Sequence, residues 1–333
     1  MRGSRGGFRA CSAAVMLAVV ALLVAGPAVA VDLRYSIFHT KTDAFSIAED
    51  KWMEIVTKRT EGRVKFKPAY AGTLFTLTEV FDAVQSGAVE MGLVAASVLS
   101  GKVPDISAFE PLGAYSEGPR FAEMMKEAGP ILEAMFAQHR VVYLWSQGAP
   151  GVINVCRNRH TKVPEDYKGL KLRAAGRWQS IQMRAMGATP IVLDPGSQYQ
   201  ALQTGTIDCA LAVNNLALSF KLHEPARFIT QYGMPVNLSI TIINPKVFES
   251  LSPEDRKIIQ EVSREVTAGS MLPLTEAQIA AAAKMKEQGA NHYYLSEGER
   301  KIFQEVSRGV YDEIRKVVGE HGKKLLELMS RYR

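Results

Sequence analysis

The stretch that decides the fold is residues 166–215, DYKGLKLRAAGRWQSIQMRAMGATPIVLDPGSQYQALQTGTIDCALAVNN. Apolar side chains recur in it first at strand and then at helical spacing, and glycines mark the helix ends. The expected elements are strands at 169–173, 189–193 and 206–213 and helices at 177–186 and 197–204. Together they form a βαβαβ unit, which right-handed crossovers arrange as a parallel sheet.

Arg173 is the first candidate for a functional residue, because ligands of parallel α/β sheets sit beyond the carboxyl ends of the strands. It ends the first strand of the unit, and the small residues Ala174, Ala175 and Gly176 follow it. Small side chains let a ligand approach the backbone. The alternative is a surface strand residue beside Lys171; we favour the ligand-binding role.

The same plan occurs earlier in the chain, where residues 32–95 predict strand, helix, strand, helix and strand. Residues 81–97 match a segment 118 residues later, with Ala, Gln, Gly and Leu identical at four positions. Any helix–glycine–strand unit would look similar, so the match alone does not establish a repeat. In either case the chain contains two similar α/β units. If they face each other, Ser97 of the first and Asn214 and Asn215 of the second border the cleft between them.

Two extended segments are expected to carry the chain between the units, one around 147–151 and the other at 235–243. A long helical pattern follows over 252–288, in which Pro273 permits a kink or break. A short strand at 291–295 and two further helices complete the expected elements.

The first thirty residues are expected to be a secretory signal peptide, cleaved after Ala30. Arg2, Arg5 and Arg9 form a positive start, an apolar run follows, and residues 28–30 have the small–x–small pattern of a cleavage site. Removing these three arginines lowers the formal net charge from +6 to +3, which is too mild to predict nucleic-acid binding. No later segment is long and apolar enough to predict a membrane span.

The mature chain would hold two cysteines, Cys156 and Cys209, both in predicted strands. An exported protein could pair them, but two thiols make no disulfide framework, and we expect both to be buried and unpaired. The six histidines are scattered without ligand spacing, and the sequence lacks hydrolase, metalloprotease and phosphate-loop motifs. We therefore expect neither a metal nor another cofactor, and no enzyme activity.

Several short motifs occur in a fixed order. They are Pro164-x-Asp166-x-Lys168-Gly-Leu-Lys-Leu-Arg173, Gly187-Ala-x-Pro190, Tyr199-x-Ala-Leu-Gln203 and Gly205-x-Ile-Asp208, with weaker echoes at Gly72 and Gln85-x-Gly87. As a set they resemble the substrate-binding proteins of tripartite ATP-independent periplasmic (TRAP) transporters, the DctP-type family. The resemblance covers essentially the whole mature chain.

The resemblance implies an α/β fold of two lobes, like a class II periplasmic binding protein. It would have mostly parallel sheets, a hinge of crossing strands and a long C-terminal helix touching both lobes. Lobe I would comprise residues 31–150 and 239–277, and lobe II residues 151–238 and 278–333. The implied function is that of a periplasmic receptor, expected to be a monomer, which closes over a small organic carboxylate and delivers it to integral membrane permease subunits. Arg173 matches the family arginine that pairs with the substrate carboxylate.

Two other functions remain as alternatives at this point. A receptor of similar shape could serve an ATP-driven importer or a sensor kinase, and a secreted enzyme is the more distant possibility. Titratable groups can converge in space without any local motif, so the missing motifs do not exclude an enzyme. A gene neighbourhood with two integral membrane proteins and no ATPase would favour the TRAP system.

This chain departs from the sugar-acid members of the resembling family at two positions. Where they carry a second arginine, this sequence has Ile153, with Asn154 next, and where they carry an asparagine it has Ala212. One cation fewer and an apolar side chain argue against a sugar acid or a dicarboxylate. They favour a monocarboxylate with an apolar or aromatic body. Other candidate lining residues are Gly72, Ser97, Trp178, Asn214, Asn215, Phe38 and Asn237.

Overall fold

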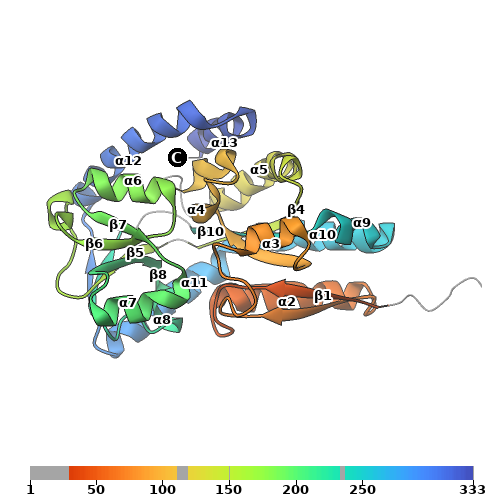
Figure 1. Ribbon diagram of the computed structural model, residues 1–333, viewed down its shortest axis with the longest axis horizontal. Helices are drawn as coiled ribbons and strands as arrows, with labels where there is room; N and C mark the ends of the chain where they lie inside the picture. Colours follow the sequence, from red (N-terminus) through yellow and green to blue (C-terminus); the bar gives the residue numbers. More distant parts are fainter. Residues whose placement is uncertain (1–29, 111–118, 150, 233–236, 333) are drawn as a thin grey trace, which may run out of the picture.

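Two helix-covered β-sheets lie side by side in the computed structural model, which describes residues 30–110, 119–149, 151–232 and 237–332 (Figure 1). Sheet A has the strand order β2-β1-β3-β10-β4, and sheet B has the order β11-β9-β5-β8-β6-β7. The strands of sheet A are β1 (Val31–Ser36), β2 (Val64–Ala69), β3 (Met91–Ala95), β4 (Val142–Ala149) and β10 (Asn237–Ile243). Those of sheet B are β5 (Val152–Cys156), β6 (Lys171–Ala174), β7 (Thr189–Val192), β8 (Cys209–Val213), β9 (Phe228–Gln231) and β11 (Asn291–Tyr294).

The two sheets share one plan. β1 pairs in parallel with β2 and β3, as β6 does with β7 and β8. One reversed strand then follows in each sheet: β10 lies between β3 and β4, and β5 lies between β8 and β9. The chain passes from sheet A to sheet B between β4 and β5, returns between β9 and β10, and passes to sheet B again between β10 and β11. The predicted two-lobed α/β fold with crossing strands is confirmed.

Helices cover both sheets and connect their parallel strands. Those near sheet A are α2 (Ala44–Arg59), α3 (Val80–Ser86), α4 (Ala96–Leu99), the 3₁₀ helix η1 (Pro104–Phe109), α5 (Pro119–Gln138), α9 (Pro245–Ser250) and α10 (Pro253–Gly269). Those near sheet B are η2 (Pro164–Tyr167), α6 (Arg177–Ala185), η3 (Pro195–Ser197), α7 (Gln198–Thr204) and α8 (Asn214–Ser219). The chain ends with α11 (Met271–Glu287), α12 (Glu297–Val317) and α13 (Glu320–Arg331).

The two matching segments have the same local structure. α3 and α7 are both seven residues long, and each ends at a glycine with positive φ: Gly87 at 82° and Gly205 at 77°. Left-handed backbone at this position favours glycine, which carries no Cβ. In both copies a buried five-residue strand follows and leads directly into a short helix, α4 or α8.

The long C-terminal helical pattern is broken where the sequence permits it. α10 ends at Gly269 and α11 begins at Met271, so Pro273 falls in the first turn of α11. A proline is tolerated there because first-turn N–H groups have no partner within the helix. α11 packs against α8 on one side and β4 on the other, and therefore touches both lobes, as expected (Figure 1).

Three hydrophobic cores hold these layers together. Sheet B has one core, which includes Ile153 and Leu172. Sheet A has two, one beneath α2 and α10 and one on its other face beneath α3, α5 and α13. The last helix, α13, packs on α5 and η1, so the C-terminal end of the described chain lies against the sheet A lobe.

The expectation that Cys156 and Cys209 are unpaired is wrong, because the structure joins them in a disulfide. They are register partners on the neighbouring antiparallel strands β5 and β8, and their Cα atoms are 4.1 Å apart. Strand position alone does not reveal such a pair, since it requires knowing that β5 inserts beside β8 from a distant part of the chain. Both sulfurs lie in the sheet B core.

Residues 1–29, which contain most of the predicted signal peptide, lie outside the described residues. Within the described ranges, no helix combines the length and the apolar character needed to cross a bilayer.

Candidate functional site at the lobe interface

Arg173 lies at the carboxyl end of β6, next to the last residue of that strand, and its side chain is buried. Nε donates a hydrogen bond to the carbonyl oxygen of Leu193 at 2.9 Å, and one terminal nitrogen donates to that of Leu211 at 3.0 Å. The Leu193 carbonyl lies just after β7, and the Leu211 carbonyl lies within β8. Both strands are neighbours of β6. The two hydrogen bonds hold the guanidinium in a fixed orientation at this end of the sheet.

No carboxylate among the described residues forms a salt bridge with Arg173. Burial lowers the pKa of Arg173 to about 10, and the charge of Asp194 partly opposes this effect. The guanidinium is still cationic at neutral pH. A buried cation held by two neutral carbonyl groups is suited to receive an anion, because an unpaired buried charge is unfavourable.

The register of sheet B places Ile153 and Arg173 on one face. Arg173 pairs with Ala210, Ile153 pairs with Ala212, and residues two apart on a strand share a face. Between the arginine and the isoleucine, β8 therefore presents two small side chains. The face beside Arg173 is apolar, and the only charge that these four residues bring is the guanidinium.

The two lobes meet at Gly176 and Ser97, just beyond the ends of β6 and β3. A Cβ added to Gly176 would lie 1.7 Å from the carbonyl oxygen of Ser97, a separation that no side chain tolerates. Trp178, two residues later on α6, is 1% exposed and packs in the core beneath α3 and α5 of the sheet A lobe. Among the described contacts its indole Nε1 is buried without a hydrogen-bond partner.

Glu110 joins the lobes at the same place. It follows η1 in the sheet A lobe, and its Oε1 accepts hydrogen bonds from the backbone N–H groups of Trp178 at 2.7 Å and Gln179 at 3.2 Å. Burial raises the pKa of Glu110 to about 7. The sequence offered no signal for this residue, because η1 and α6 are far apart along the chain.

Asp43 makes a second connection between the lobes. Its Oδ1 caps α2 by accepting from Phe45 N at 2.9 Å and also accepts from Asn215 Nδ2 at 2.7 Å. Its Oδ2 accepts from the hydroxyl of Ser219 at 3.2 Å and lies 3.4 Å from Nδ1 of the fully buried His39. The contact with α8 joins segments 172 residues apart along the chain.

Asp194 makes a third connection, from the sheet B lobe. Its two carboxylate oxygens accept from the backbone N–H of Thr78 at 3.1 Å and from the Thr78 hydroxyl at 3.0 Å. Since Leu193 and Asp194 are adjacent, the segment that binds Arg173 also binds the sheet A lobe. The position of the arginine is thereby linked to the approach of the two lobes.

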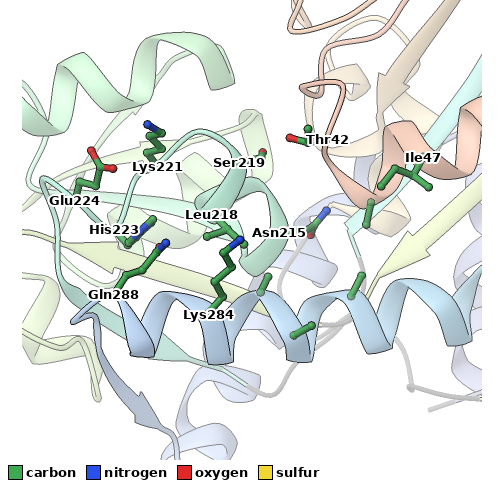
Figure 2. A pocket seen from close by; sticks show the side chains of 14 residues that line it. Thr42, Ile47, Asn215, Leu218, Ser219, Lys221, His223, Glu224, Lys284 and Gln288 are labelled. Carbon is green, nitrogen blue, oxygen red and sulfur yellow. The ribbon is translucent and has the colours of Figure 1, made fainter.

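A pocket of about 600 Å³ opens where α2, α8 and α11 meet, and Figure 2 shows its lining. Thr42 and Ile47 come from the α2 side, Asn215 and Ser219 from α8, and Lys284 from α11. Arg173 does not line this pocket. Lys221, His223 and Glu224, which follow α8, also line the pocket.

The remaining predicted residues have protein partners or lie at the edge of the interface. Asn154 Nδ2 donates to Thr161 Oγ1 at 3.0 Å. Asn214 and Gln231 exchange two amide hydrogen bonds at 3.0 and 2.7 Å. Phe38 is buried beside His39, and Gly72 donates its N–H to the Ile37 carbonyl near the end of β1. Asn237 begins β10, and its side chain lies outside what the structure describes.

Within the described part of the chain, no group of three or more His, Cys, Asp or Glu side chains is arranged to hold a metal ion. The carboxyl groups of Asp43, Glu110 and Asp194 are each hydrogen-bonded across the interface, and the Arg173 guanidinium is held within the sheet B lobe. Two α/β lobes joined by crossing strands, with a buried arginine at the strand ends of one of them, define a two-lobed solute-binding protein.

Comparison with known proteins supports this class. Residues 36–316 match the DctP family, described as bacterial extracellular solute-binding protein, family 7. The chain belongs to this family. The sequence resemblance is thus confirmed, and with it the function of a TRAP-type extracellular solute receptor.

Three similar proteins illustrate the relationship. The C4-dicarboxylate-binding periplasmic protein DctP of Rhodobacter capsulatus is 25% identical over 285 residues, 81% of this chain and 82% of the relative. A TRAP solute-binding protein from a Sulfitobacter species, solved with β-D-galacturonate, has a TM-score of 0.83 at 20% identity and covers 90% of this chain and 100% of its own. DctP7 of Bordetella pertussis, a receptor binding pyroglutamic acid, has a TM-score of 0.84 at 19% identity with the same coverage.

Proposed function

We propose that this receptor captures its ligand between the two lobes through one main anchor, Arg173, which pairs with the ligand's carboxylate. The observation that carries the proposal is the buried guanidinium, oriented by Leu193 and Leu211 and without a salt bridge to any described carboxylate. A planar guanidinium matches a carboxylate with two parallel hydrogen bonds. The ligands named for the three similar proteins, a C4-dicarboxylate, galacturonate and pyroglutamic acid, all carry a carboxylate.

The preferred ligand is a monocarboxylate with an apolar or aromatic body. This preference rests on Ile153, which shares a sheet face with Arg173, and on the alanines of β8 between them. A second charge or several hydroxyl groups buried there would lack partners, which is unfavourable. The named ligands of the similar proteins vary in charge and polarity, so the preference depends on this chain's own residues.

Closure of the lobes over the ligand is part of the same proposal. The lobes comprise residues 31–150 with 239–277 and residues 151–238 with 278–333; α13, from the second set, packs against the first. Carboxyl groups that bridge the lobes include those of Asp43, Glu110 and Asp194. Such contacts can form only when the lobes are together, and their loss on opening would release the ligand.

The cellular setting follows from the family and the N-terminal sequence. We place the mature protein, cleaved after Ala30, in the periplasm as a monomer that delivers its ligand to the integral membrane subunits of a TRAP permease. It has no catalytic role in this account. Arg2, Arg5 and Arg9 and the apolar run after them are the sequence features that support export.

A thermal-shift screen of the purified mature protein against small carboxylates tests the proposal. Each acid is paired with its primary amide, which has similar shape but no negative charge. At a concentration of 100 Kd, a ligand stabilises the protein by about 2.7 kcal/mol. We expect at least one monocarboxylate to stabilise the protein and its amide to fail. Equal stabilisation by the two members of every pair would contradict a charged anchor.

A further inference from the structure

The first turn of α6 takes its cap from the other lobe. α6 starts after Gly176, which has no side chain to accept from the first N–H groups, and no side-chain cap from its own N-cap residue is present. Unpaired N–H groups at a buried helix end are unfavourable. Glu110 fills this role through its bonds to Trp178 N and Gln179 N.

The segment that Glu110 holds is the continuation of the Arg173 strand. Only Ala174 and Ala175 separate Arg173 from Gly176. Gln179 Oε1 accepts from Ala175 N at 2.9 Å, which ties the first turn of α6 to this link. A shift of the α6 terminus would therefore move the backbone that follows the arginine.

We propose that Glu110 is a positioning residue for ligand binding, which fixes the Arg173–Trp178 segment when the lobes close and makes ligand affinity depend on pH. The inference rests on the proposed function, since it requires that closure accompanies binding. Glu110 does not contact the ligand in this account; it acts through the backbone of α6.

The environment of the carboxyl group sets the sign of the pH dependence. In the closed arrangement burial raises the pKa of Glu110 to about 7, while the backbone N–H bonds and Arg177 on α6 act in the opposite direction. The Ser100 hydroxyl, beside the carboxyl group, also lowers its pKa. When the lobes separate, the group reaches water, where a glutamate pKa is about 4.3.

The closed state therefore binds the proton more tightly than the open state. By linkage, closure is favoured at low pH, and this advantage is lost as the pH rises through about 7. Between pH 8 and pH 6 the two pKa values predict an affinity gain of about tenfold.

Three variants separate positioning from general stability. Glu110→Gln is neutral in both the open and the closed arrangement and keeps an acceptor oxygen, so its affinity should be the same at pH 6 and pH 8 and should exceed that of the wild type at pH 6. Glu110→Ala has no acceptor and should bind about fivefold more weakly than Glu110→Gln. Thr78→Ala removes a hydroxyl contact with Asp194 at another point of the interface and should keep the wild-type pH slope.

The measurement is the Kd of benzoate at pH 6 and pH 8 by calorimetry. All other ionisable groups are common to the three variants and the wild type, so the difference in slope isolates Glu110. The same slope in wild type and Glu110→Gln would overturn the proposal, as would a Thr78→Ala variant that loses the slope.

A second measurement needs no ligand and keeps the two proposals separable. Quenching of Trp178 fluorescence by acrylamide is taken as the difference between the wild type and Trp178→Phe. We expect Trp178 to be better protected at pH 6 than at pH 8 in the wild type and equally protected in Glu110→Gln. Protection that is independent of pH in the wild type overturns the role of Glu110. Failure of benzoate and all other carboxylates to bind, with pH-dependent protection intact, would overturn the proposed function instead.

Discussion

The backbone of Gly176 lies against the carbonyl group of Ser97, so that the ends of β6 and β3 touch across the two lobes. A Cβ on Gly176 would come within 1.7 Å of that carbonyl oxygen and 2.8 Å of Glu110 Oε1. Backbone atoms cannot yield as a flexible side chain can, so any larger residue must push the lobes apart.

Gly176→Ala should therefore prevent full closure while leaving each lobe folded. In small-angle X-ray scattering with a saturating carboxylate, the radius of gyration of the wild type should decrease on binding, and that of the variant should not. Gly101→Ala is the matched control, because nothing lies within 4 Å of a Cβ at Gly101. An equal decrease in wild type and Gly176→Ala would show that this contact does not limit closure.

The Cys156–Cys209 disulfide should stabilise the folded protein. It joins residues 53 apart, and closing a loop of this size typically contributes about 2–4 kcal/mol by restricting the unfolded chain. Urea unfolding of the oxidised and reduced mature protein should show this difference in the free energy of unfolding. A double variant, Cys156→Ala with Cys209→Ala, should be insensitive to reductant. Two titratable thiols in the oxidised folded protein would contradict the pairing.

Ligand selectivity should reflect Ile153. Competition calorimetry is expected to rank monocarboxylates with apolar or aromatic bodies, such as benzoate or a branched 2-oxo acid, above succinate and galacturonate. Ile153→Arg supplies a second cation on the Arg173 face and should improve the binding of succinate relative to benzoate. Tighter wild-type binding of succinate or galacturonate than of every apolar monocarboxylate would show that the interpretation of Ile153 is wrong.

Much of the fold could be predicted from local patterns. Residues 166–215 formed the expected strands and helices because glycines end its helices and its apolar residues keep a regular period. The matching unit near the N-terminus followed for the same reason. The insertion of β5 and β10 as reversed strands in the sheets could not be predicted, because their partners lie far away in sequence. The disulfide was missed for this reason.

The site was predictable only in part. The position of Arg173 at a strand end could be predicted because a strand followed by small residues is a local sequence feature. Its role in binding a carboxylate stays a prediction. The contacts that join the lobes, at Asp43, Glu110 and Asp194, could not be predicted from local sequence. Each forms between segments that are far apart along the chain. Asn214 was expected to face a ligand, and the structure instead pairs it with Gln231, a partner that no local spacing reveals.

The central claim is that Arg173 anchors the carboxylate, and calorimetry on its variants tests it most directly. Arg173→Ala would leave a buried carboxylate unpaired and should weaken binding of the best acid from the thermal-shift screen by about 3–5 kcal/mol. Arg173→Lys should recover only part, because a point charge cannot reproduce two parallel hydrogen bonds. Lys171→Ala, which removes an exposed cation from the same strand, should bind like the wild type. Wild-type affinity in Arg173→Ala would remove this residue from the binding site and contradict the account.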